Sequence, residues 1–562
     1  MQKIWRVKKP DIVLQEELSS SLGISPFLSQ LLINRKITTQ EEAEEFLYSG
    51  SSSFHNAKLL PDIDKAKSRV QKALREQEKV LIFSDYDADG LTSLAVLKTA
   101  FRRMGINHEH YIPHRLKEGY GLSEDAVQYT YSRGFSLLIT LDCGIANFKE
   151  IAELKELDID TIVIDHHNLV SDTLPPAYAI INPKRRDSQY PEQDLAGVGL
   201  TYKFAGYLLG SLLEEELDLV CLGTIADVVP LIGENRIIVR EGLKRLANTK
   251  RPGLRALMEV SGIKNKAVNT EYVSYILAPR INACGRLGSC EDALSLLLSD
   301  SEPESLLLAR ELHAKNKERS RIGANVMAEA LSRLESGIDF AKERVIILYQ
   351  ENWHPGVLGI VAAKLTEKFH RPAIIVSFIN GIGKGSGRSI ENFHLFEGLY
   401  ECRQYLEGFG GHKRACGLSI LEHNIEHFRK EINRIALERL RPEDLLPNLA
   451  IDMQVELPDL NNKLLDELNL LEPFGQANPK PLFSSSNLKV KSRPAVLGRN
   501  TLKFWVSDGK VTYPAVGFGM SDYLDLVNSS AEVNLAYRLS LDDWNGAHQL
   551  QLELVDIHAS II

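Results

Sequence analysis

The sequence predicts an α/β fold built on a parallel sheet. From about residue 64 to 170, strand-like apolar runs alternate with amphipathic helical stretches, and three of those runs end in acids or histidines. Such alternation is typical of a parallel sheet, whose ligands bind at the carboxyl ends of the strands. We expect a second α/β unit after it, joined by one long helix, and an OB-like β-barrel at the C-terminal end.

The ends of the three predicted strands carry side chains that bind cations. The first strand covers residues 80–83, the second 137–141 and the third 161–164. The side chains that follow them are Asp85, Asp87 and Asp89, then Asp142, then Asp165, His166 and His167. Carboxylates gathered at one edge of a sheet repel each other unless cations neutralise them. The sequence therefore predicts a metal site.

An EF-hand calcium loop is the first alternative for the run from Asp85 to Gly90. That loop requires a glutamate at its twelfth position and a helix in front of it, but the twelfth position here is Val96 and a strand precedes the run. We therefore reject calcium binding of this kind. An ordinary acidic turn is disfavoured because acids also follow the neighbouring strands.

Asp227 is a further candidate ligand, since apolar residues flank it on both sides. An unpaired buried carboxylate costs several kcal/mol, so this side chain needs a cation or a hydrogen-bond donor. Capping of the next segment is the alternative role. Carboxylates and imidazole without thiolates favour Mn²⁺ or Mg²⁺. Two such ions about 4 Å apart activate water near neutral pH, which points to phosphoester hydrolysis.

Composition indicates a cytoplasmic, globular, multidomain protein. The chain has 562 residues, 44% hydrophobic and 25% charged, and lacks an apolar stretch of the roughly 20 residues needed to span a bilayer. Its six cysteines form no Cys-x-x-Cys pair. The net charge of −9 excludes a wholly basic nucleic-acid coat, so a polyanion must be held in a local groove.

We expect the following organisation. The segments are 1–60, an N-terminal helical segment; 61–302, the catalytic domain; 303–340, a connector helix; 341–441, the second α/β domain; and 442–562, the OB-like domain. Phe504, Trp505, Tyr537 and Trp544 could stack bases in the last domain, although core packing is the commoner role for such residues.

These motifs resemble the DHH phosphoesterase superfamily. Asp165-His166-His167 matches its signature, and the segment from Gly410 to His412 looks like part of the associated DHHA1 domain. Residues 280–287 and 472–479 are similar to segments of the RecJ family, whose members are single-strand-specific 5′→3′ DNA exonucleases. The resemblance covers nearly the whole chain.

The resemblance implies a ligand set for two ions, Mn²⁺ or Mg²⁺. Asp87 and Asp142 would hold one ion, and Asp89, Asp142, His166 and Asp227 the other, so that Asp142 is the bridge. Asp85 is either a ligand or a neighbouring acid. His167 would face the scissile phosphate, and Asp165 would orient the histidine pair.

The resemblance also implies a set of residues that contact the nucleic acid. Glycines and Arg388 in residues 383–389 read as an anion-binding loop, for which a flexible turn is the alternative. By similarity, Ser386, Arg388 and Arg115 would capture a 5′ phosphate, and Tyr120 would hinder entry of duplex. The remaining expected contacts are Arg280, Asn282, Arg286, Gly410, Gly411 and His412.

The resemblance implies an exodeoxyribonuclease that degrades single-stranded DNA 5′→3′ to mononucleotides in DNA repair and recombination. We expect a monomer that associates with no membrane and works with a helicase and a single-strand-binding protein. The alternative within the superfamily is a phosphodiesterase for short oligonucleotides or cyclic dinucleotides. A strand-binding scaffold without metals is disfavoured because every ligand position is intact.

Overall fold

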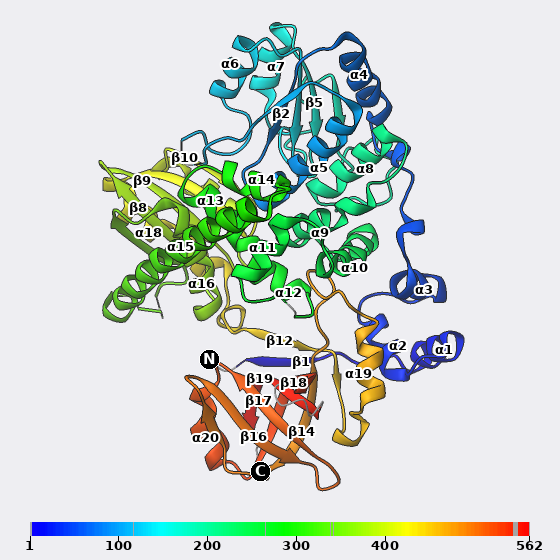
Figure 1. Cartoon of the computed structure of the whole chain (residues 1–562). Helices are drawn as coiled ribbons and strands as arrows, with labels where there is room; N and C mark the ends of the chain where they lie inside the picture. Colours follow the sequence, from blue (N-terminus) through cyan, green and yellow to red (C-terminus); the bar gives the residue numbers. More distant parts are fainter. Residues whose placement is uncertain are drawn as a thin grey trace. The chain divides into compact units, whose positions relative to one another are not determined.

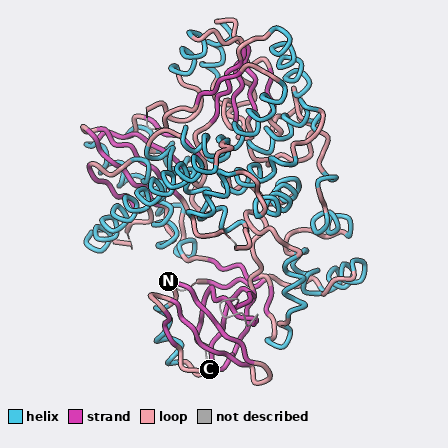
Figure 2. The backbone as a smooth tube through the Cα atoms, viewed as in Figure 1, coloured by secondary structure: helices cyan, strands magenta, loops and turns pink. Residues whose placement is uncertain are grey.

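The computed structural model describes residues 3–115, 117–264, 266–337, 339–340, 342–542 and 549–560. The chain divides into two compact units (Figures 1 and 2). Unit 1 combines Met1–Phe54, Pro230–Arg240 and Pro447–Ile562, and unit 2 combines His55–Val229 and Glu241–Leu446. Unit 1 is thus built from both ends of the chain and a short piece of its middle.

The predicted parallel sheet is confirmed and lies in unit 2. Its strand order is β3-β2-β4-β5-β6, and every neighbouring pair is parallel. The strands are β2 (Val80–Ser84), β3 (His108–Tyr111), β4 (Leu137–Leu141), β5 (Asp160–Ile164) and β6 (Ala179–Ile181). Because β2, β4 and β5 are adjacent and parallel, their carboxyl ends meet at one edge.

Helices cover both faces of this sheet, which explains why its central strands are almost wholly apolar. On one face, Leu81, Phe83 and Val163 pack against α6 (Glu124–Ser132) and α7 (Phe148–Glu156). On the other lie α4 (Ile63–Glu76), α5 (Ala88–Met104) and α8 (Gly197–Leu209), as Figure 1 shows. All side chains of β2 and β4 are buried.

A helical segment and one long helix follow the sheet. The helices are α9 (Leu217–Ala226), α10 (Gly233–Ala247), α11 (Pro252–Val260), α12 (Thr270–Tyr272), the π-helical η4 (Val273–Leu277), α13 (Ala278–Leu287), α14 (Glu291–Leu298) and α15 (Glu302–Gly337). The long α15 is the expected connector. It packs against α11, α13 and α14 on one side of the connection and against α16 (Pro355–Phe369) on the other.

The second α/β part of unit 2 has a mixed sheet of order β10-β11-β9-β8-β7. Its strands are β7 (Ile346–Glu351), β8 (Ala373–Ile379), β9 (Ile382–Arg388), β10 (Gly408–Gly411) and β11 (Ala415–Leu421). The helices are α16, α17 (Leu395–Glu401) and α18 (Ile425–Arg439). β7 and β8 are parallel, whereas β9, β10 and β11 pair antiparallel.

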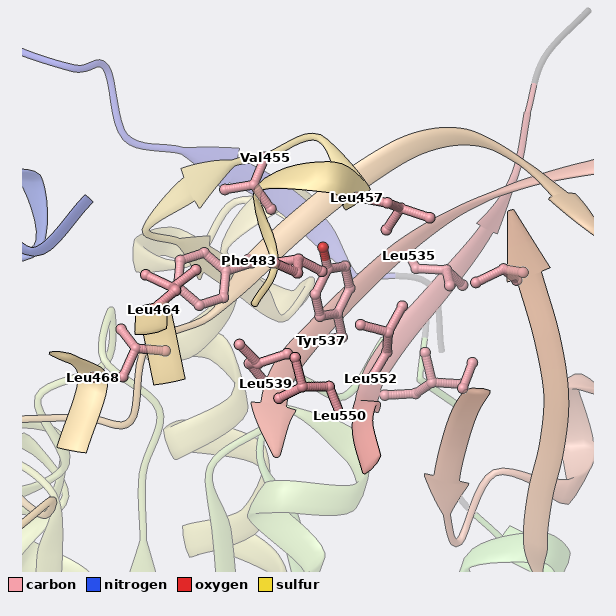
Figure 3. Close-up of a cluster of buried hydrophobic side chains, with 14 of the residues drawn as sticks. Val455, Leu457, Leu464, Leu468, Phe483, Leu535, Tyr537, Leu539, Leu550 and Leu552 are labelled. Atoms are coloured by element: carbon pink, nitrogen blue, oxygen red, sulfur yellow. The ribbon is translucent and has the colours of Figure 1, made fainter. Parts of the chain in front are cut away.

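Unit 1 contains the expected OB-like barrel. Strands β14 (Phe483–Val490), β18 (Glu532–Asp542), β19 (Gln549–Ala559), β17 (Thr512–Phe518) and β16 (Thr501–Ser507) pair in that order, and β16 pairs back to β14. This last pairing closes the ring. Tyr537 and Phe483 lie in its core beside Leu535, Leu539 and Leu552 (Figure 3).

The remaining elements of unit 1 cover the barrel and tie the chain ends together. They are β1 (Ile4–Val7), α1 (Ile12–Leu22), α2 (Pro26–Ile33), α3 (Gln40–Tyr48), β12 (Asn448–Ile451), β13 (Met453–Gln454), α19 (Asn462–Asn469), β15 (Ala495–Leu497) and α20 (Leu524–Ser529). β1 pairs in parallel with β12, so the first strand of the chain is held by a strand more than 400 residues later.

The aromatic residues of the barrel divide between core and surface. Phe504 and Tyr537 are buried, and Tyr537 shares a hydrogen bond of 2.7 Å with Ser485. Trp505 is half-buried on β16. Trp544 lies outside the described residues. Within the described ranges, no helix is both long and apolar enough to cross a membrane.

Arg236 links three segments of unit 1 from the inside. Its side chain is 2% exposed and donates to the carbonyls of Phe46 (2.8 Å), Leu471 (2.8 Å) and Leu470 (3.0 Å). The guanidinium carbon also lies 3.9 Å from the centre of the Phe46 ring. Burial, and then the charges of Arg240 and Arg35, lower the pKa of Arg236 to about 9, so it remains charged at neutral pH.

We expect Arg236→Met to destabilise unit 1 by about 3 kcal/mol, because it leaves buried carbonyls without a donor. Amide hydrogen exchange, read separately on peptides from α3, α19 and β4, measures the loss. Exchange should accelerate in α3 and α19 and stay unchanged in β4. The matched control is Arg499→Met, at an exposed arginine of the same unit. Equal protection in both variants would contradict this role.

Candidate metal and phosphate site

The site begins with the turn that follows β2. Asp87 caps α5, because its Oδ1 accepts from the backbone amides of Asp89 (3.0 Å) and Gly90 (3.1 Å). A Cβ at Gly90 would lie 2.4 Å from the carbonyl oxygen of Asp85, so only glycine allows this close approach. The tight turn brings the three alternating acids to the edge of the sheet, with Asp85 5% and Asp89 1% exposed.

Asp142 follows β4 directly and lies at the centre of the acidic cluster. Its backbone has φ = +60°, a left-handed conformation that is uncommon for a non-glycine residue. Its amide donates to the Ile164 carbonyl at 2.9 Å, which fixes the turn against β5. The side chain is 2% exposed, and its Oδ1 has no hydrogen-bond partner.

Asp165 positions the histidine pair after β5. One carboxylate oxygen accepts from the Ile145 amide at 2.9 Å, and the other accepts from the amide (3.0 Å) and Nδ1 (2.7 Å) of His167. Both of its oxygens accept hydrogen bonds from the protein, so Asp165 holds the backbone and ring of His167 in place.

His166 directs a free nitrogen at the carboxylates. Its Nε2 lies 3.1 Å from Asp142 Oδ1 and 3.4 Å from Asp227 Oδ2, yet it makes no hydrogen bond and is buried. The ring also hydrogen-bonds to the backbone at Leu195. Because Nε2 makes no hydrogen bond within the protein, this nitrogen is open to a cation between the ring and the acids.

Helix α8 contributes the other wall of the cluster. The two oxygens of Asp89 accept from the first amides of this helix, Gly197 and Val198, at 2.8 Å each. A Cβ at Gly197 would lie 2.9 Å from Asp142 Oδ1 and 3.0 Å from Asp89 Oδ2. Glycine at this position therefore makes room for the carboxylates.

The electrostatics show strong unbalanced negative charge. Burial first, and then neighbouring carboxylates, raise the pKa values of Asp85, Asp142 and Asp227. Burial and the charge of Asp87 raise the pKa of Asp89 to about 7. Burial lowers the pKa of His166 to about 3, so this imidazole is neutral and able to bind a metal.

His167 behaves in the opposite way. Burial disfavours its charged form, but the hydrogen bond and charge of Asp165 outweigh that effect and raise the pKa of His167. The same interaction lowers the pKa of Asp165 despite its burial. The pair therefore favours an imidazolium next to the acids, partly exposed and in reach of a substrate.

The donor set fits divalent cations. Potential ligand atoms form three groups, and within each group all atoms lie within 4.8 Å of one another. The groups are Asp85, Asp87 and Asp142; Asp89, His166 and Asp227; and Asp142, His166 and His167. Unbonded buried atoms on Asp85, Asp142 and His166 point to missing positive charge. Oxygen ligands with imidazole suit Mn²⁺ or Mg²⁺.

Cationic side chains from α13, α15, β9 and the turn at Arg115 gather beside the acids. Burial, and then the charges of Arg115, Arg319 and Arg388, lower the pKa of Arg286 to about 10. Burial and the charge of Arg115 likewise lower the pKa of Arg388. Arg115 lies 5.0 Å from the centre of the Tyr86 ring. Arginines whose positive charges lie this close together form a site for polyanions.

The prediction of a loop at residues 383–389 is wrong, because residues 382–388 form strand β9. Its glycines let large side chains pack closely: a Cβ at Gly385 would lie 2.9 Å from Leu418 Cδ1. Ser386 and Arg388 share one face of the strand, with Nη1 of Arg388 3.3 Å from the Ser386 hydroxyl. Gly359 of α16 provides room for both side chains.

The other expected contact residues are distributed unevenly. The Tyr120 hydroxyl donates to the Asp142 carbonyl at 3.2 Å and lies 3.2 Å from His167 Nδ1, so this exposed ring borders the cluster. Asn282 Oδ1 accepts from the Ala88 amide at 2.8 Å, which ties α13 to the acidic turn. Arg280 donates to the Ile276 carbonyl at 2.5 Å within the helical segment.

Gly410 and Gly411 belong to edge strand β10, and His412 follows it, with its amide bonded to the Ala415 carbonyl. His412 is exposed and is not a member of the three ligand groups. Arg286 donates to the Gly356 carbonyl at 3.1 Å, at the start of α16, and so lies where the two α/β parts of unit 2 meet.

The sequence analysis missed three residues of the site. They are Gly197, the hydrogen-bond acceptor Leu195, and Asn182, whose buried side-chain amide donates to the His167 carbonyl at 3.0 Å. The run Ala196-Gly197-Val198-Gly199 carried a signal, because small residues at a helix start often mark a close backbone approach. No sequence pattern around Asn182 indicated its role.

Sequence models of three protein families match the chain. They are the DHH family N-terminal domain at residues 79–224, the DHHA1 domain at 342–438 and the RecJ OB domain at 451–556. The first covers the acidic strand ends, the second the sheet with β9, and the third the barrel.

Similar proteins span nearly the whole chain. The single-stranded-DNA-specific exonuclease RecJ of Bacillus subtilis is 37% identical over 99% of this chain and 71% of its own length. The Escherichia coli protein of the same name is 34% identical over 95% and 96%, respectively. The crystal structure of RecJ with Mn²⁺ from Thermus thermophilus matches with a TM-score of 0.86 and 29% identity, over 100% of this chain and 80% of that one.

We expect Mn²⁺ binding to release protons. The raised pKa of Asp89, about 7, means that this carboxyl is largely protonated at pH 6, and a bound cation must displace its proton. Affinity should therefore rise between about pH 6 and pH 8. Calorimetric titration of the metal-free protein in two buffers of different ionisation enthalpy measures the release. Equal heats in both buffers and a flat affinity would contradict the protonated cluster.

Proposed function

The chain belongs to the RecJ family of single-stranded-DNA-specific exonucleases, and we propose that it removes mononucleotides from the 5′ end of a DNA strand. The observation that carries this proposal is the cluster of unbonded, buried ligand atoms beside a group of arginines. One part of the site binds cations and the other binds phosphates, which is what hydrolysis of a phosphodiester requires.

We assign the cation ligands as two groups that share Asp142. Asp87 and Asp142, with Asp85 beside them, would hold one ion, and Asp89, Asp142, His166 and Asp227 would hold the other. The ligand groups found in the structure support this division. When bound, two Mn²⁺ or Mg²⁺ ions activate water and stabilise phosphoryl oxygens.

His167 acts on the scissile phosphate in this proposal. The 2.7 Å hydrogen bond from Nδ1 to Asp165 and the raised pKa support an imidazolium that donates to a phosphoryl oxygen. Tyr120 lies against the same ring, with ring centres 5.7 Å apart. Its exposed position supports a role as a barrier at the entrance, against which a single strand can bend and a duplex cannot.

The arginines set the direction of degradation. Arg388 with Ser386, and Arg115, would bind the 5′ terminal phosphate, while Arg286 would hold the next phosphate closer to the acids. The lowered pKa values of Arg286 and Arg388, to which burial and neighbouring arginines contribute, support the proposal, because a phosphate would relieve the repulsion. Arg280 and Asn282 would hold backbone phosphates near the cations, and His412 would close the site from the second α/β part. For Asn282, the bond to Ala88 also supports a role in positioning the acidic turn.

We place the protein in the cytoplasm, as a monomer that acts in DNA repair and recombination. A helicase that exposes single strands and a single-strand-binding protein that coats them are the partners we propose. The support for these assignments is the family, since strand degradation needs a supply of unwound DNA.

The experiment that tests the function uses single-stranded DNA labelled at either end, with a duplex of the same sequence as the control. With Mn²⁺ present, the 5′ label should leave as mononucleotide and the duplex should persist. Release of the 3′ label first would overturn the direction. Cleavage restricted to dinucleotides would favour a phosphodiesterase for short substrates.

We expect Asp142→Ala to lower the rate by at least about a thousandfold, because loss of the shared ligand loosens both cation sites and removes several kcal/mol of stabilisation. Rates of mononucleotide release and Mn²⁺ affinity are measured together. Asp172→Ala, at an exposed acid paired with Arg186, is the matched control. If the Asp142→Ala protein were about as active as the unmodified protein, the two-ion assignment would be wrong.

We expect Arg388→Ala to reduce the preference for 5′-phosphorylated over 5′-hydroxyl ends by about 10- to 100-fold, since a charge-assisted bond contributes roughly 1.5–3 kcal/mol. Steady-state rates on the two substrates give the ratio, and Mn²⁺ affinity should not change. Arg434→Ala, at an exposed arginine of α18, is the control. Equal losses on both ends would argue against a terminal-phosphate pocket.

A further inference from the structure

Two thiols lie directly behind the acidic turn. Cys284 is in α13 and Cys290 precedes the first residue of α14, and their sulfurs are 3.2 Å apart. Both side chains are buried, at 0% and 4% exposure. The hydrolytic reaction uses neither, and their contacts connect them to the part of the site that binds cations.

The thiol pair is connected to the acidic turn by one direct contact and by one contact through the helix that carries Cys284. Cys290 Sγ lies 3.3 Å from the carbonyl oxygen of Tyr86, the residue between Asp85 and Asp87. On the same helix as Cys284, Asn282 accepts the hydrogen bond of the Ala88 amide at 2.8 Å. The turn thus contacts Cys290 at Tyr86 and α13 at Ala88.

The packing between α13 and the turn is close. A Cβ at Gly285 would lie 3.1 Å from the Tyr86 carbonyl oxygen and 3.3 Å from Cys290 Sγ. Well-packed interiors transmit small displacements because they contain little free space. A movement of either sulfur will therefore shift Tyr86 and the acids on either side of it.

We propose that Cys284 and Cys290 are a modification site, at which a peroxide forms an intramolecular disulfide that weakens cation binding by the acidic turn. The effect on cations rests on the proposed function. A disulfide has a sulfur–sulfur distance of about 2.05 Å, so the sulfurs must approach by about 1 Å. Oxidation also removes the S–H group that Cys290 directs at the Tyr86 carbonyl.

The chemistry balances with hydrogen peroxide as the oxidant. The sulfur of one thiol attacks a peroxide oxygen, the O–O bond breaks, and a sulfenic acid and water form. The sulfur of the second thiol then displaces the sulfenic oxygen, which leaves as water with the thiol proton. The two thiols lose two electrons and two protons, and the peroxide becomes two waters.

Burial makes this reaction slow. The short segment between α13 and α14 has to open before peroxide reaches the sulfurs, and such local opening is a normal native-state fluctuation. The hydrogen bond with Cys284, followed by burial, raises the pKa of Cys290, which further limits its thiolate form. The disulfide is therefore expected after prolonged exposure to peroxide, and not at the first encounter.

The test uses the full-length, metal-free protein, incubated with hydrogen peroxide and then freed of it with catalase. Peptide mass spectrometry should find Cys284 linked to Cys290. Mn²⁺ affinity, measured by electron paramagnetic resonance of the free ion, should fall about tenfold, the usual scale for disturbing residues that support metal ligands. Dithiothreitol should restore it.

Cys290→Ser provides the matched variant, because its hydroxyl can still donate to the Tyr86 carbonyl but cannot form the link. We expect ordinary Mn²⁺ affinity that peroxide does not change. Cys402→Ser, at a buried thiol in the hydrophobic core of the second α/β part, should behave like the unmodified protein.

Two outcomes would overturn the inference: oxidation elsewhere without the Cys284–Cys290 link, or the link with unchanged Mn²⁺ affinity. The assay on end-labelled DNA is run on the reduced protein in parallel. Failure of the reduced protein to cut DNA would contradict the proposed function, while the disulfide and Mn²⁺ measurements would still decide this inference.

Discussion

The repulsion among buried carboxylates at one edge of a sheet is the constraint on which the site depends. Asp85, Asp89 and Asp142 are at most 5% exposed, and their raised pKa values record the cost of holding charge there. Folding alone relieves little of this cost. Backbone amides at the start of α8 satisfy Asp89, whereas Asp142 keeps an oxygen without a partner. Bound cations have to neutralise the remaining negative charge, so the stability of this part of the fold depends on ions.

Much of this arrangement was predictable from local sequence. Apolar strands that end in acids fix the parallel sheet, the shared edge and the ligand types, because adjacent parallel strands bring their carboxyl ends together. Valine at position 96, where an EF-hand loop needs glutamate, excludes a calcium loop of that kind. The tight turn at Gly90 follows from the same local pattern.

Long-range features could not be read from local sequence. Glycine alternation at residues 383–387 resembles a loop, but packing of Leu418 and Val376 over the missing side chains makes it strand β9. The backbone interaction of the His166 ring involves Leu195, some thirty residues away in the sequence. The arginine group draws on α13, α15, β9 and the turn at Arg115, and each arginine taken alone looks like an ordinary surface charge. In these cases tertiary contacts decide the outcome.

The discontinuity of unit 1 has a consequence for the order in which the protein can acquire its structure. Strand β1 and helices α1–α3 are synthesised some 400 residues before β12, α19 and the barrel, with which they form unit 1. Leu28, Leu31 and Phe46 must therefore remain without the later side chains of their core, from Val455 onward, while some 400 residues are synthesised. The catalytic sheet can assemble during that interval, since it is contiguous. The nascent chain thus carries an unfinished apolar segment while the parallel sheet is synthesised, and unit 1 can complete its core only when the strands of the barrel follow.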